Sequence, residues 1–118
     1  MIAILLSTYN GSKYLREQLN SIIDQTVKDW ILYVRDDGST DETIDIIKEY
    51  VSLYPNINYI EDIQNLGSAR SFMKLLSLVE ADHYMFCDQD DVWLPTKIEV
   101  SLMEMKKQKY CILIIFRY

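Results

Sequence analysis

Acidic side chains gather in the segment Cys87-Asp88-Gln89-Asp90-Asp91, directly after an apolar run of strand length. Residues two apart in an extended segment point to the same side, so Asp88 and Asp90 are predicted to face the same way. Two carboxylates about 4 Å apart repel by roughly 4 kcal/mol at an effective dielectric of 20, and a divalent cation between them removes that cost. Mg²⁺ or Mn²⁺ is commonly held by one or two carboxylates plus phosphate oxygens. The segment therefore predicts a metal-bridged diphosphate site, and chance is the alternative because 18 of the 118 residues are acidic.

Polar residues also follow two earlier apolar runs. Ser7, Thr8 and Tyr9 come after residues 2–6, and Asp36 and Asp37 come after residues 30–34. Tyr9 is either a platform for a nucleotide base or an aromatic side chain that packs on the next helix. The first group is therefore a candidate binding loop, and the two acids are candidates for a second one.

Alternating strand and helix patterns surround these loops. Apolar runs predict strands at residues 2–6, 30–34, 56–61, 83–87 and 110–116, with helical stripes between them. Ser39 followed by Glu42 predicts a capping box at the start of the second helix. The pattern predicts an α/β, Rossmann-like three-layer αβα fold with an open, mostly parallel sheet. Because the carboxyl ends of parallel strands meet at one rim, all the polar loops are expected on the same edge.

The composition narrows the class of protein. A chain of 118 residues that is 49% hydrophobic fits one domain spanning residues 1–118. A net charge of −6 argues against a nucleic-acid partner, which would need a basic face. Cys87 and Cys111 have no zinc spacing and are expected as reduced thiols, which predicts a cytoplasmic location. Peripheral association of a longer parent protein with the inner face of the membrane stays open.

Four motifs, in order and at these spacings, resemble the amino-terminal half of the family 2 glycosyltransferases, which have the GT-A (nucleotide-diphospho-sugar transferase) fold. They are residues 7–11 (Ser-Thr-Tyr-Asn-Gly), 36–41 (Asp-Asp-Gly-Ser-Thr-Asp), 65–67 (Asn-Leu-Gly) and 88–91 (Asp-Gln-Asp-Asp). The resemblance covers about residues 1–109, and residues 110–118 form an atypical end. The wording of residues 71–72 and 87–95 is similar to a bacterial rhamnosyltransferase-like subset.

The resemblance implies a hexosyltransferase-type enzyme of polysaccharide biosynthesis with a UDP- or dTDP-sugar donor. Asp37 would accept a hydrogen bond from the ring N–H of uracil or thymine, and Asp36 would shape its loop. Asp88 and Asp90 would hold Mg²⁺ or Mn²⁺ as the Asp-x-Asp pair. The nucleotide-binding residues implied as a set are Ser7, Thr8, Tyr9, Asp36, Asp37, Arg70 and Gln89. Arg70 falls in the first turn of a predicted helix, where the dipole disfavours a cation.

In such enzymes the acceptor site and the catalytic base follow the metal motif, so no catalytic residue is assigned here. The sequence is expected to be a truncated catalytic domain that binds donor without efficient transfer to its glycan or lipid-linked acceptor. Exposed apolar surface is expected to favour self-association of such a chain. The alternatives are a non-catalytic nucleotide-sugar-binding module and a receiver-like signalling domain.

Overall fold

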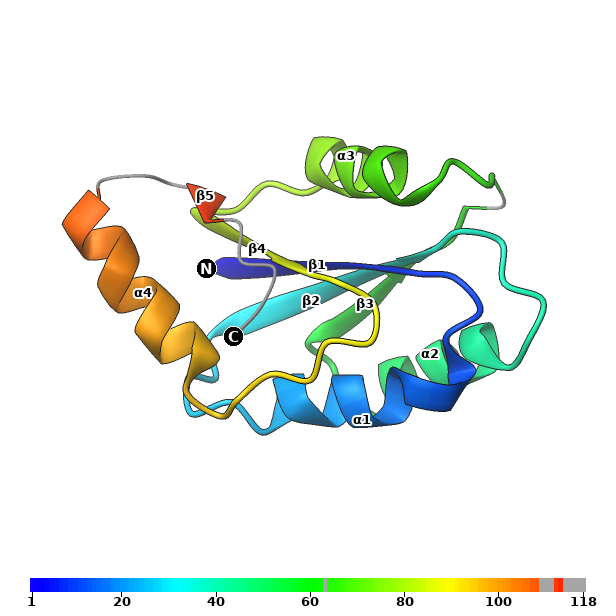
Figure 1. Cartoon of the computed structure of the whole chain (residues 1–118), viewed down its shortest axis with the longest axis horizontal. Helices are drawn as coiled ribbons and strands as arrows, with labels where there is room; N and C mark the ends of the chain where they lie inside the picture. Colours follow the sequence, from blue (N-terminus) through cyan, green and yellow to red (C-terminus); the bar gives the residue numbers. More distant parts are fainter. Residues whose placement is uncertain (63, 109–111, 114–118) are drawn as a thin grey trace.

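Five parallel strands among the described residues form one sheet in the order β3-β2-β1-β4-β5 (Figure 1). The structure, a computed structural model, describes residues 1–62, 64–108 and 112–113. The strands are β1 (Ile2–Thr8), β2 (Trp30–Asp36), β3 (Ile57–Ile60), β4 (His83–Cys87) and β5 (Ile112–Leu113). The helices are α1 (Ser12–Ile23), α2 (Thr43–Leu53), α3 (Ser68–Leu78) and α4 (Lys97–Gln108).

Helices cover both faces of the sheet, which is why β1 is buried along its whole length. Alternate side chains of the strand point to opposite faces. Ile2, Ile4 and Leu6 pack in the larger core with residues of α1 and α2, whereas Ala3 and Leu5 pack in a smaller core with residues of α3. Figure 1 shows α3 on one side of the sheet and α1 with α2 on the other. The predicted three-layer αβα architecture is confirmed.

Most predicted strands are found, with changes at their ends. β2 continues two residues further than expected, to Asp36, and β3 spans only Ile57–Ile60 of the predicted 56–61. Of the predicted strand at residues 110–116, Ile112–Leu113 pairs with β4 as β5, and the other positions lie outside the described residues. None of the described helices has the length and hydropathy needed to cross a membrane.

The capping box predicted from Ser39 and Glu42 is wrong. α2 begins at Thr43, and its amino end has no side-chain hydrogen bond from the capping residue Glu42. Ser39 instead donates its hydroxyl to Asp36, while Asp41 accepts the Thr43 N–H at 2.9 Å. The strand-end carboxylate therefore competes successfully for Ser39, and the helix starts one turn later than the motif suggests.

Candidate functional site

Three strand ends surround a cavity of about 430 Å³ at the carboxyl rim of the sheet. Thr8 at the end of β1 pairs with Asp36 at the end of β2, and Cys87 at the end of β4 pairs with Leu6. The cavity is lined by Ser7, Thr8, Tyr9, Asp37, Asn65, Gly67, Ser68 and Gln89. The predicted convergence of these loops on one edge is therefore found, because five of the predicted site residues line one space.

Asp36 holds the loop after β2 in place. Its side chain is buried and accepts the hydroxyl of Thr8 at 2.7 Å and that of Ser39 at 2.6 Å. It also accepts the backbone N–H groups of Gly38 and Ser39. These four donors fit the loop-shaping role that the resemblance implied for Asp36, and its place in the nucleotide-binding set stays a prediction.

Asp37 lies at the amino-terminal end of α3. Its Oδ2 accepts the Gly67 N–H at 2.9 Å, and its Oδ1 accepts the Leu66 N–H at 2.7 Å. These N–H groups and the positive end of the helix dipole favour a negative charge. Burial alone would raise the pKa of Asp37, but the Leu66 N–H, the Arg35 guanidinium and the Gly67 N–H together hold it below its usual value. The carboxylate is thus ionised at neutral pH although it is only 5% exposed.

Gly67 is required for this arrangement because its φ of +84° lies in the left-handed region. Residues with a Cβ are strained there, so glycine turns the chain into α3 at little cost. Asn65 supports the same loop by donating its side-chain amide to the Asp37 carbonyl oxygen at 3.0 Å. Residues 65–67 were recognised from the sequence as one of the four family motifs, but no structural role was predicted for them.

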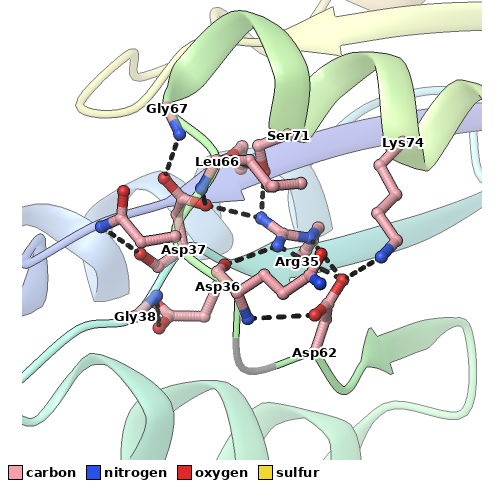
Figure 2. A network of polar contacts seen from close by, with 12 residues as sticks. Arg35, Asp36, Asp37, Gly38, Asp62, Leu66, Gly67, Ser71 and Lys74 are labelled. Atoms are coloured by element: carbon pink, nitrogen blue, oxygen red, sulfur yellow. Dashed lines mark hydrogen bonds and ion pairs between the residues drawn. The ribbon is translucent and has the colours of Figure 1, made fainter.

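Arg35 is the central member of a buried polar network (Figure 2). Its side chain is fully buried and pairs with Asp37 at 2.7 Å and with Asp62 at 3.3 Å. Lys74 on α3 pairs with the same Asp62, and Ser71 on α3 accepts from the guanidinium at 2.8 Å. Arg35 is a site residue that the sequence pattern did not predict. The available signal was its charge next to an apolar strand, since a buried charge must be paired.

Gln89 connects the loop after β4 to the loop after β1. Its Oε1 accepts the Tyr9 backbone N–H, and a Cβ on Gly11 would come within 3.0 Å of its side chain. Tyr9 lines the cavity and is 47% exposed, so about half of the residue's surface is open to solvent. Such a ring is available to stack on a ligand, which is the binding alternative for this residue.

The expectation that Asp88 and Asp90 share the side of an extended strand is wrong. β4 ends at Cys87, and the Asp91 N–H donates to the Asp88 carbonyl oxygen at 3.2 Å, which makes a turn. Asp90 lies in that turn with a φ of +72° and is exposed, whereas Asp88 is half-buried. The argument that Asp88 and Asp90 repel each other because they share one side of a strand therefore does not hold.

The residues of this turn still fit a divalent cation held largely by phosphate. No group of three or more His, Cys, Asp or Glu side chains in the described part of the chain could hold a metal alone. Asp91 Oδ2, however, is buried without a hydrogen-bond partner among the described residues. A buried oxygen of this kind is satisfied by a water or a cation. A carboxylate oxygen without a hydrogen-bond partner suits a divalent cation that takes its other ligands from substrate phosphates.

Arg70 is placed differently from the other predicted nucleotide-binding residues. It lies in the first turn of α3 and is exposed, as predicted for its position in the helix. The described lining of the cavity does not include it. Arg70 therefore stays a prediction that depends on a ligand reaching past the cavity.

Comparisons with known proteins agree on one family. The sequence matches the family described as "Glycosyl transferase family 2" over residues 3–118. It is 38% identical over 102 residues to the "dTDP-rhamnosyl transferase RfbG" of Shigella flexneri, covering 82% of this chain and 35% of that protein. It is 29% identical over 111 residues to the "Putative teichuronic acid biosynthesis glycosyltransferase TuaG" of Bacillus subtilis, covering 94% and 44%. The chain thus spans between a third and a half of these relatives' length.

Solved structures share the fold. The crystal structure of S. aureus TarS 1-349 in complex with UDP-GlcNAc matches with a TM-score of 0.81 and 25% identity, over 92% of this chain and 32% of that one. The mannosyltransferase PcManGT from Pyrobaculum calidifontis in complex with GDP-Man and Mn2+ also has a TM-score of 0.81, over 88% of this chain and 32% of that one. At 19% identity the second likeness concerns the fold alone.

Proposed function

The chain belongs to glycosyl transferase family 2, as its motifs led us to expect, and from that premise we propose that it forms the donor-binding part of a glycosyltransferase. The donor is a nucleotide-diphosphate sugar, with UDP and dTDP as the nucleotides the site fits best. The observation that carries this proposal is the single cavity lined by Thr8, Tyr9, Asp37 and Gln89 from three strand ends.

Each wall of the cavity suits a different part of such a donor. Asp37 is an ionised acceptor and fits the ring N–H of uracil or thymine. Tyr9 offers an exposed ring for stacking on the base. The relative named as a dTDP-rhamnosyl transferase and the TarS complex with UDP-GlcNAc support these two nucleotides, because both bases carry that N–H.

A divalent cation at Asp88 and Asp90 is part of the proposal. When bound, Mg²⁺ or Mn²⁺ would supply Lewis-acid stabilisation of the leaving diphosphate. Asp90 is the more exposed of the two carboxylates and is proposed as the direct ligand. Gln18 keeps the loop in place by donating its buried side-chain amide to the Asp88 carbonyl oxygen.

We further propose that a glycosyltransferase containing this donor-binding part transfers the sugar to a glycan or lipid-linked acceptor in polysaccharide biosynthesis, in the cytoplasm or at the inner face of the membrane. Family membership favours this function over that of a receiver-like domain. The activity proposed for these 118 residues is donor binding.

Isothermal titration calorimetry with UDP and Mn²⁺ tests the proposal. The wild-type chain is expected to bind UDP more tightly with Mn²⁺ than without it, and Asp90→Ala is expected to lose that difference. Asp82→Ala, an exposed acid that pairs with the amino terminus at the opposite end of β4, is the matched control. Absence of UDP binding by the wild-type chain, with or without Mn²⁺, would refute the proposal.

A further inference from the structure

We propose that Arg35 is a positioning residue that sets the base selectivity of the cavity. It does so by fixing the Asp37 carboxylate, whose Oδ2 keeps one acceptor position open. The inference rests on the proposed function, since it concerns the nucleotide that Asp37 would contact. It adds a residue that lies behind the cavity wall and outside the motif of paired acids.

The hydrogen bonds of Asp37 leave one acceptor position open. A carboxylate has about four lone-pair positions, two on each oxygen. Oδ1 accepts from Arg35 Nη1 at 2.7 Å and from the Leu66 N–H, so both of its positions are used. Oδ2 accepts only from the Gly67 N–H among the described residues. The remaining position on Oδ2 is therefore the one that a ligand in the cavity can use.

Arg35 is itself held on every side, which makes it a rigid support. Nη1 also donates to Ser71 Oγ at 2.8 Å, and Nη2 donates to the Gln64 carbonyl oxygen at 2.7 Å. Nε donates to Asp62 at 3.3 Å. A planar guanidinium can serve these divergent acceptors at once, whereas a lysine ammonium on a flexible stem cannot hold the same geometry. Figure 2 shows the group between Asp37 on one side and Asp62 on the other.

The same network reaches a second wall of the cavity. Ser7 lines the cavity from β1, and its hydroxyl is hydrogen-bonded to Ser71 Oγ, the acceptor of Arg35. Arg35 therefore supports two side chains of the cavity wall: Asp37, just after β2, by direct contact, and Ser7 of β1 through Ser71 of α3. A change in the guanidinium would move Asp37 directly and Ser7 through Ser71.

Charge balance adds to the geometric argument. Asp37 and Asp62 both pair with Arg35, and Lys74 is the other cation paired in this group, on Asp62. Without the guanidinium, Asp37 would lose its cation and keep the Asp62 carboxylate nearby. Like charges at close range favour protonation of one of them. Arg35 thus keeps Asp37 an acceptor as well as keeping it in place.

The consequence for the base is specific. Uracil and thymine present a ring N–H that can donate to Oδ2, whereas cytosine presents a lone pair at the same ring position. A fixed carboxylate accepts the first and repels the second. A site built around one hydrogen bond discriminates strongly against a ligand that cannot make it. Selectivity for UDP over CDP is therefore a readout of how well Asp37 is held.

Calorimetric titration of UDP and of CDP, each with Mn²⁺, tests the inference on the wild-type chain and on Arg35→Lys. UDP and CDP carry the same diphosphate, so the ratio of their dissociation constants isolates the base. Loss of a hydrogen-bond partner that orients a metal ligand costs about 10–100-fold in metal affinity. By analogy, we expect Arg35→Lys to weaken UDP binding by at least about tenfold. CDP binding is expected to change little, so the ratio falls towards one. The matched control is Arg16→Lys, an exposed arginine paired with Glu49 on the helix surface.

The outcomes separate this inference from the proposed function. If the wild-type chain binds neither nucleotide, the proposed function fails. If it prefers UDP and Arg35→Lys keeps that preference, the positioning role of Arg35 is overturned while donor binding stands. Equal weakening of UDP and CDP binding by a folded Arg35→Lys variant also contradicts a selective role. If Arg35→Lys does not fold, the charge-balanced double variant Arg35→Gln with Asp62→Asn takes its place, and the same ratio decides.

Discussion

Neighbouring carboxylates in this chain have distinct tasks that follow from their partners. Asp36 accepts four hydrogen bonds from its own loop and from Thr8, so little of its capacity remains for a ligand. Asp37, one residue later, keeps an acceptor position at the cavity. Asp41 ties two helices together, because it accepts N–H groups from Thr43 at 2.9 Å and from Ser12 at 3.2 Å. The chemistry of each acid is set by which backbone N–H groups lie within reach.

Asp41→Asn is predicted to destabilise the chain at neutral pH and to have a smaller effect in acid. The pKa of Asp41 is lowered from 3.8 to about 2, mainly by the hydrogen bond from the Thr43 hydroxyl. Burial opposes this shift, and the N–H groups of Thr43 and Ser12 add to it. A lowered pKa stabilises the folded state above the unfolded value and loses that effect as pH falls through the folded value. The difference between wild type and variant should therefore shrink between about pH 5 and pH 2.

Urea unfolding at a series of pH values measures this effect. The control is Asp24→Asn, an exposed acid at the end of α1, for which we expect a difference that changes much less over the same range. A wild-type minus Asp41→Asn difference that stayed constant from pH 5 to pH 2 would contradict the assigned role of the Asp41 charge.

The sequence predicted the site where local pattern was enough. Ser7, Thr8, Tyr9 and Asp37 were named from their places after apolar runs and Gln89 from the family resemblance, and all five line the cavity. Arg35 was missed because a strand pattern does not show that a charge finds partners in other segments, here Asp62. Ser39 was misread because the capping motif ignores the competing carboxylate of Asp36. Hydrogen-bond partners decide both cases, and apolar periodicity does not identify them.

At the scale of elements, α1 supports the loop after β4, which carries the proposed metal ligands. Gln18 donates to the Asp88 carbonyl oxygen and to Cys87 Sγ, and Ser21 Oγ accepts the Trp93 N–H at 3.0 Å. Gln25 is fully buried and binds the Leu94 carbonyl oxygen at 2.7 Å. Two polar residues of α1 and one just after its end thus replace strand pairing as the support of residues 88–94.

Gln25→Leu is predicted to destabilise the chain by about 2 kcal/mol, since it leaves a buried N–H without an acceptor. Gln25 Oε1 accepts the Ile98 N–H at 3.0 Å in the first turn of α4, and its Nε2 binds the Leu94 and Ser21 carbonyl oxygens. Urea unfolding measures the loss, and hydrogen exchange of the Ile98 amide should become faster. Gln64→Leu, at an exposed side chain, is the control and should stay within about 0.5 kcal/mol. Unchanged exchange at Ile98 would contradict the supporting role of Gln25.

The elements themselves were predicted better than their buried polar residues. Continuous apolar runs identified β1, β2 and β4, because a strand covered on both faces has no polar side. Helical stripes identified α1 and α3 in the same way. Gln18 and Gln25 fall on the buried side of α1 or just beyond its end, and apolar periodicity has no rule for such residues. Their role depends on backbone groups about 70 residues away in the sequence.

At the scale of the whole molecule, the fold concentrates its polar contacts at one rim and its apolar contacts on two faces. The sheet separates a large core under α1 and α2 from a smaller one under α3. Apolar side chains also remain exposed outside both cores. Among the described residues, Val100 is 50% exposed and Met103 is 58% exposed, both on α4. Residues three apart lie on the same side of a helix, so these two form one apolar strip.

This strip predicts that the 118-residue chain self-associates as its concentration rises. Contiguous apolar surface that is not covered within a chain tends to be buried between copies. The double variant Val100→Gln with Met103→Gln keeps the net charge and removes most of the apolar area, so it should remain monomeric at concentrations where the wild type does not. Sedimentation velocity over a dilution series measures both proteins.

Met73→Gln with Leu78→Gln is the matched control, because these exposed residues are five apart on α3 and do not lie on one side of the helix. Association should therefore persist in this variant. A wild-type chain that sediments as a single monomer across the series would contradict the prediction, and equal loss of association in both double variants would assign it to general hydrophobicity instead of α4.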